Sequence, residues 1–133
     1  MTQEDKELLL KDLCTRLPYG VKVCCNKKVY NIDAYTKSAF MLAEPLKPDV
    51  CIVAHIEEIN PYLFPMSSMT EEQKREYDRI IYHSIELHYR EYSDIVEIDL
   101  FDILQDFYCK NHFDYRGLIE KGLAIDATNK NIY

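Results

Sequence analysis

Asp99, Asp102 and Asp106 are spaced three and four residues apart, so an α-helix would bring them onto one face. Such a row of carboxylates could bind a divalent cation or a basic protein surface. Solvation alone also selects acidic residues for the outer face of an amphipathic helix, and this simpler reading competes with the first. Because the row lies in the most acidic part of the chain, we take the three aspartates as candidate interaction residues.

The excess negative charge is concentrated in one segment. Residues 70–106 carry eleven acidic and four basic side chains. Their net charge of −7 equals the formal net charge of the whole chain. Their field repels phosphate backbones and attracts basic partners over roughly 8–10 Å at physiological salt. We therefore expect no direct nucleic-acid binding and a protein partner that is basic. In an extreme form, the segment would mimic nucleic-acid charge and occupy a basic protein.

Tyrosine is abundant in the same segment. The chain has eleven tyrosines and no tryptophan, and Tyr82 and Tyr89 lie in a stretch with helical periodicity. Tyrosine is favoured where one end of a side chain is dry and the other wet, which includes protein contacts. We add Tyr82 and Tyr89 to the candidate interaction residues, with core filling as the alternative.

Metal and catalytic motifs are weak. Cys109 and His112 have a C-x2-H spacing, but tetrahedral zinc requires a second pair. His83 and His88 are five residues apart, which places them about 140° apart around a helix. We expect no metal and no cofactor. The alternative to a binding protein is a small enzyme of unknown reaction with a pocket near Arg116, His112 and Cys109.

The cysteines and the N-terminus favour a cytoplasmic protein. The number of cysteines is odd and their spacing does not resemble a disulfide framework, so we expect reduced thiols packed among apolar residues. The N-terminus is acidic, unlike a signal peptide, and no apolar run approaches the ~20 residues of a membrane span. The cysteines are Cys14, Cys24, Cys25, Cys51 and Cys109.

Hydrophobic periodicity predicts a single α+β domain over residues 1–133. Residues 1–60 read as a helix over 2–17 followed by a β-meander over 20–59, which is a small antiparallel sheet of three to five strands or a curled barrel. Residues 61–69 form a connector that should be irregular because of its prolines. Residues 70–133 are helical with a short C-terminal tail.

The helical part contains two predicted helices. The first runs from the capping residues Ser68 or Thr70 to about Tyr92 and should bury Ile85, and the second covers 95–110 and should bury Ile103. We expect both helices to pack against the sheet.

Two further stretches carry a family resemblance. The runs NPYLFPMSSMTEEQ (60–73) and FDYRGLIEKGLAI (113–125) resemble a family of small uncharacterised proteins of phages and mobile elements of gut bacteria. The resemblance implies a bacterial or phage-infected bacterial cytosol. It brings no reaction, ligand or catalytic residue with it.

The sequence thus favours a binding or regulatory accessory protein that acts by protein contact through an acidic, tyrosine-bearing helical face. A homo-oligomer whose acidic helices face outward is a structural alternative. Arg116 is a further candidate residue, because it could clasp a carboxylate of residues 70–106 or recognise the carboxylate or phosphate of a ligand.

Overall fold

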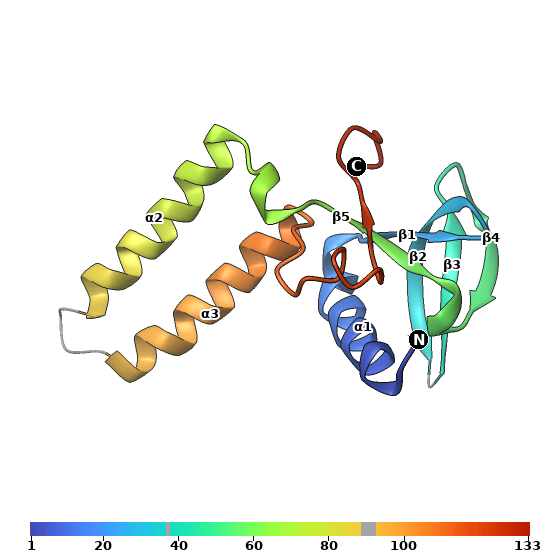
Figure 1. Cartoon of the computed structure of the whole chain (residues 1–133), viewed down its shortest axis with the longest axis horizontal. Coiled ribbons are helices and arrows are strands. Elements are labelled where there is room, and N and C mark those ends of the chain that lie inside the picture. The colour runs from blue at the N-terminus through green and yellow to red at the C-terminus, as the bar shows by residue number, and fades with distance from the viewer. Residues whose placement is uncertain (37, 89–92) are drawn as a thin grey trace.

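The computed structural model describes residues 1–36, 38–88 and 93–133 and confirms an α+β fold (Figure 1). Short 3-10 turns follow α1, β4 and β5. The elements in chain order are α1 (Gln3–Arg16), β1 (Lys22–Cys25), β2 (Lys28–Thr36), β3 (Ala39–Glu44), β4 (Lys47–Ala54), β5 (Asn60–Leu63), α2 (Glu71–His88), α3 (Ser93–Lys110) and β6 (Ile125–Asp126).

Helix α1 begins and ends where the sequence signals it. Thr2 and Asp5 form a capping box, in which each side chain accepts a hydrogen bond from the other residue's backbone N–H. Pro18 lies in the turn after the helix, and Gly20 adopts the left-handed conformation with φ of 74°. Leu9 and Leu13 are fully buried against the sheet.

The sheet is open and mixed. Its strand order is β4-β3-β2-β1-β5-β6, in which β1 to β4 form an antiparallel meander and β6 pairs parallel with β5. The barrel alternative was therefore wrong. The three to five antiparallel strands predicted for residues 20–59 are present as β1 to β4, and β5 and β6 extend the sheet to six strands. The connector prediction also failed in part, because Asn60–Leu63 forms β5 and Pro61 pairs opposite Val23 of β1. A proline near the start of a strand is tolerated because fewer ladder hydrogen bonds are lost there.

The core lies between α1 and one face of the sheet. It combines Leu9 and Leu13 of α1 with Phe40 and Leu42 of β3 and with Leu118 of the C-terminal segment. The expectation that the C-terminal helices cover the sheet is not met, since α2 and α3 lie side by side and point away from the sheet (Figure 1). We call this pair of helices the α2–α3 arm.

Aromatic rings join the α2–α3 arm to the rest of the fold. Tyr77 of α2 lies 6.1 Å from Phe107 of α3, measured between ring centroids. Phe107 lies 5.9 Å from Phe113, and Tyr108 stacks on Tyr115 at 5.1 Å. These aromatic residues fill the base of the arm. At the start of α2, Thr70 and Gln73 form the capping box, which selects the second of the two predicted registers.

Candidate functional site

The α2–α3 arm exposes large apolar side chains. Tyr82 of α2 is 70% exposed and Phe101 of α3 is 64% exposed, and Ile85 and Ile103 are also exposed. None of the α2 side chains for which the structure gives a burial is buried. A pair of helices that leaves this much apolar surface in water is typical of a protein contact site.

A groove runs between α2, α3 and the turn after α1. Its apolar members are Ile80, Ile103 and Phe107, and its volume is about 370 Å³. At its rim, the Lys110 amine lies 3.2 Å from a Glu76 carboxylate oxygen. The Tyr19 hydroxyl, which also lines the groove, donates a hydrogen bond to the Asp106 carboxylate. The groove therefore combines an apolar strip with charged edges.

The predicted interaction residues fall in different places. Asp102 and Asp106 are exposed on α3, and Tyr82 is exposed on α2. Asp99 lies on α3, but its side chain is outside the described part of the chain, and Tyr89 lies outside it entirely. Arg116 lies in the segment after α3, where it contacts α1 instead of the arm.

Sequence reasoning missed the exposed apolar residues. Ile85 and Ile103 were predicted to be buried because they recur at helical spacing with other apolar residues. The structure exposes both. Their spacing shows only which residues share a face, and it cannot show whether anything covers that face.

Arg116 belongs to a buried ion-pair cluster. Asp12 accepts hydrogen bonds from Nε of Arg16 at 2.7 Å and from Nε of Arg116 at 3.2 Å. Asp12 and Arg16 are fully buried, and the Nη2 of Arg16 donates to the Phe113 carbonyl at 2.6 Å. The Arg116 guanidinium lies 4.8 Å from the centroid of the Tyr115 ring. This geometry fits a structural clasp between α1 and the segment after α3.

The candidate catalytic residues near Arg116 are poorly suited to chemistry at neutral pH. Cys109 is fully buried, and burial raises the pKa of its thiol, which disfavours the reactive thiolate. Burial and the nearby Arg16 and Lys22 lower the pKa of His112 to about 4. The His112 ring is stacked on Tyr133 at a centroid distance of 3.6 Å. Cys109 is thus enclosed in the core, and the partly buried His112 ring is packed against Tyr133.

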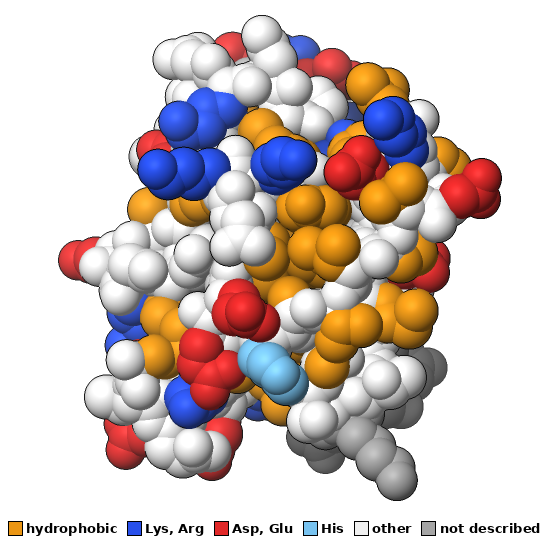
Figure 2. All heavy atoms as spheres, turned by 90° about the vertical axis from the view of Figure 1, so that its right-hand side faces the viewer, with side chains coloured by type: hydrophobic (Ala, Val, Ile, Leu, Met, Phe, Trp, Pro, Cys, Tyr) orange, Lys and Arg blue, Asp and Glu red, His pale blue; other side chains and the backbone are white. Residues whose placement is uncertain are grey.

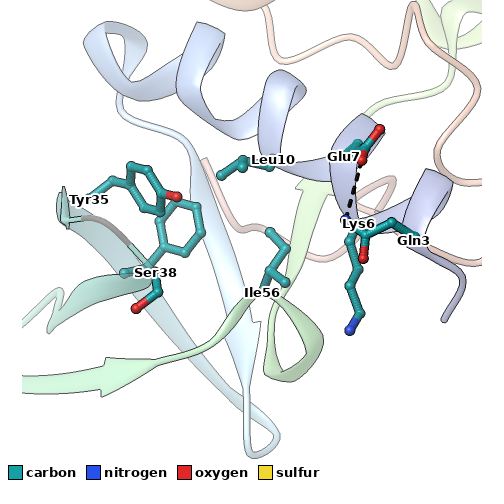
Figure 3. A pocket seen from close by; sticks show the side chains of 8 residues that line it. Gln3, Lys6, Glu7, Leu10, Tyr35, Ser38 and Ile56 are labelled. Carbon is teal, nitrogen blue, oxygen red and sulfur yellow. Dashed lines mark hydrogen bonds between the residues drawn. The ribbon is translucent and has the colours of Figure 1, made fainter.

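Four surface hollows are lined by described residues, and none of these four linings includes Cys109, His112 or Arg116. Figure 3 shows one of them, which lies between α1 and the β2–β3 end of the sheet and holds about 190 Å³. Its apolar lining includes Leu10, Tyr35 and Ile56, and the Lys6 amine extends away from these side chains toward Glu57, at 2.6 Å. Ligand pockets usually hold roughly 300–1,000 Å³, so this hollow gives little support to a small-molecule site.

Two kinds of feature are absent from the described residues. No cluster of three or more histidine, cysteine or acidic side chains that could hold a metal ion occurs among them. None of the helices in the same part of the chain is both long and apolar enough to cross a membrane.

The chain matches no protein-family model, no curated protein and no solved structure, so the family resemblance stays a prediction.

Proposed function

We propose that the chain is a protein-binding module whose contact surface is the α2–α3 arm. The observation that supports this most directly is the exposure of Tyr82 and Phe101, together with Ile85 and Ile103, on helices that point away from the core. Aromatic side chains are enriched in protein interfaces and often dominate their binding energy.

The groove between the helices suggests the shape of the partner. Two packed helices leave a lengthwise groove into which the apolar face of a third helix can fit, which is a common mode of peptide recognition. Here Ile80 and Ile103 would meet that face, above the buried Phe107 ring. An amphipathic helix of the partner protein is therefore the element that fits.

The charge of the α2–α3 arm suggests the sign of the charge on the partner surface. Helices α2 and α3 carry ten acidic and four basic side chains, an excess of six negative charges out of the net −7 of the chain. Asp102 and Asp106 are exposed beside the groove residue Ile103. Complementary charge speeds encounter and disfavours wrong partners, so the partner surface should be basic.

Capture of partners from a bacterial lysate, followed by quantitative mass spectrometry, tests the proposal. One bait carries Tyr82→Ser with Phe101→Ser, and another carries Asp102→Lys. Their matched controls are Leu46→Ser, an equally drastic change at an exposed apolar residue of the body, and Glu120→Lys, a charge reversal at an exposed acid of the body.

We expect the wild type and both controls to retain the same basic protein, and both arm variants to lose most of it. Elution by salt should release that protein, because the steering charges are exposed. If the arm variants retain the same proteins as the wild type, the arm is not the contact surface.

A further inference from the structure

The face of the sheet opposite α1 has its own apolar surface. In the strand registers of β2, β3 and β4, Ala34, Met41 and Val53 form one row across the sheet, and Ala43 and Cys51 lie in the next row. These residues alternate with the core residues Phe40 and Leu42 and therefore point to the other side. We call this surface the outer sheet face.

The outer sheet face is open to solvent over β4. Val53 is 67% exposed and Cys51 is exposed. Figure 2 shows hydrophobic side chains gathered at the centre of this side of the molecule. An antiparallel sheet with one solvated face normally alternates apolar and polar residues, whereas β3 and β4 carry apolar residues on both faces. Such strands are typical of a sheet that is covered on both sides.

Charged side chains lie at opposite ends of the outer sheet face. Lys27, Lys28 and Lys47 are exposed at the end formed by the β1–β2 and β3–β4 turns, with Asp49 beside them. Beyond the other end of β4, Glu57 and Glu58 are exposed. Glu57 also pairs with Lys6 of α1 at 2.6 Å, and a carboxylate oxygen of Glu58 accepts the His55 backbone N–H. Figure 2 shows most of the lysine or arginine side chains above the apolar centre, with acidic side chains among them, and further acidic side chains and a histidine below it.

We propose that a second copy of this chain covers the outer sheet face. Two-fold pairing is the commonest form of oligomer and brings the same patch of both copies together. We place the two-fold axis in the plane of the interface and perpendicular to the strands. Rotation about this axis reverses the strand direction, so the lysine end of one copy meets the acidic end of the other. Ala34 and Cys51 have small side chains and lie beside Met41 and Val53, so a second sheet could approach to the usual packing distance of about 10 Å.

This pairing leaves the proposed function intact. The α2–α3 arm extends from the side of the molecule opposite β3 and β4 (Figure 1). Both arms of a dimer therefore remain available to a partner. The dimer and the partner contact can fail independently, because they use different surfaces.

Sedimentation equilibrium over a dilution series tests the dimer. Val53→Lys places a positive charge on the exposed β4 edge of the face, and we expect it to raise the dimer dissociation constant by roughly a hundredfold or more. Phe101→Lys is the matched control, because its side chain on the arm is as exposed as that of Val53. We expect this variant to dimerise like the wild type. Circular dichroism confirms that both variants are folded.

Two native cysteines give a second measurement without any substitution. Cys51 lies on the outer sheet face and Cys14 lies on α1, and both are exposed. We expect maleimide labelling of Cys51 to slow as the protein concentration rises, while labelling of Cys14 does not change. Any one of four results would overturn the proposal. The wild type could stay monomeric, the dimer could survive Val53→Lys, or the dimer could be lost in Phe101→Lys. The fourth such result is Cys51 labelling that does not depend on protein concentration.

Discussion

The Nε of Arg116 donates a hydrogen bond to Oδ1 of Asp12 at 3.2 Å, across 104 residues of sequence. The pair joins α1 to the segment after α3, and Asp12 is buried where it meets both Arg116 and Arg16. Sequence reasoning anticipated a clasp at Arg116 but placed its partner in residues 70–106. The partner is instead a carboxylate of the first helix, so the clasp joins the two ends of the fold.

Removing either side of this pair should destabilise the protein. Asp12→Ala leaves two arginines without their shared carboxylate, and we expect a loss of about 3–5 kcal/mol in the free energy of unfolding. Arg116→Ala leaves Asp12 paired with the buried Arg16, and since Arg116 is partly exposed we expect a smaller loss of about 1–3 kcal/mol. Urea denaturation followed by circular dichroism measures both values.

The control for these variants is an exposed ion pair. Lys74 and Glu71 lie 3.4 Å apart on the surface of α2, so Lys74→Ala should change the free energy of unfolding by no more than about 0.5 kcal/mol. If Asp12→Ala is no worse than Lys74→Ala, the cluster is not a clasp.

His112 should make the fold sensitive to mild acid. Burial, with help from Arg16 and Lys22, lowers its pKa from 6.5 to about 4 in the folded protein. Below pH 6.5 the unfolded chain therefore binds a proton at His112 that the folded chain excludes. Neutral His112 therefore contributes fully to the free energy of unfolding above pH 6.5. This contribution, about 2–3 kcal/mol, is lost as the pH falls to about 4.

The measurement compares urea denaturation of the wild type and His112→Asn between pH 7 and pH 4. Asparagine tolerates the left-handed backbone that His112 adopts, at a φ of 60°. We expect the variant to lose less stability on acidification than the wild type, since it lacks the buried imidazole that the unfolded chain protonates first. His83→Asn, at an exposed site on α2, should keep the pH dependence of the wild type. Identical pH slopes for the wild type and His112→Asn would contradict the prediction.

Local signals predicted the elements of the fold well. These signals depend only on residues close together in the chain. They are the capping boxes of Thr2 and Thr70, the end of α1 before Pro18, and the apolar periodicity of α1. The strands of the meander follow from alternation and short turns, because short connections force antiparallel pairing.

Long-range relationships could not be predicted in the same way. Three contacts join segments that are far apart in the chain. They are the pairing of β5 with β1, the parallel pairing of β6 with β5, and the ion pair of Arg116 with Asp12. The candidate site shows the same limit, since periodicity grouped Ile103 with Phe107 but could not show that Ile103 is exposed and Phe107 is buried. Exposure depends on what covers a face, which is a property of the tertiary fold.

Substitution of two phenylalanines on α3 should distinguish a ring that packs within the monomer from a ring that is exposed for a partner. Phe107 is buried between Tyr77 and Phe113, so Phe107→Ala should lower the free energy of unfolding by about 3–5 kcal/mol. Phe101→Ala, at an exposed site, should change it by no more than about 0.5 kcal/mol. Thermal denaturation of both variants measures the difference. A large loss in Phe101→Ala would show that this ring packs within the monomer and is not held free for a partner.

Cysteine reactivity tests the enzyme alternative. Cys109 is fully buried and its thiol pKa is raised by burial, so iodoacetamide should leave it unmodified in the native protein at neutral pH. Cys51, which is exposed in the single chain, should react when the protein is dilute enough to be monomeric, and Cys109 should react only after urea denaturation. Mass spectrometry of tryptic peptides identifies the modified residues. Modification of native Cys109 faster than Cys51 would require an accessible thiolate beside Arg116 and His112, and would favour a nucleophilic site over the structural clasp.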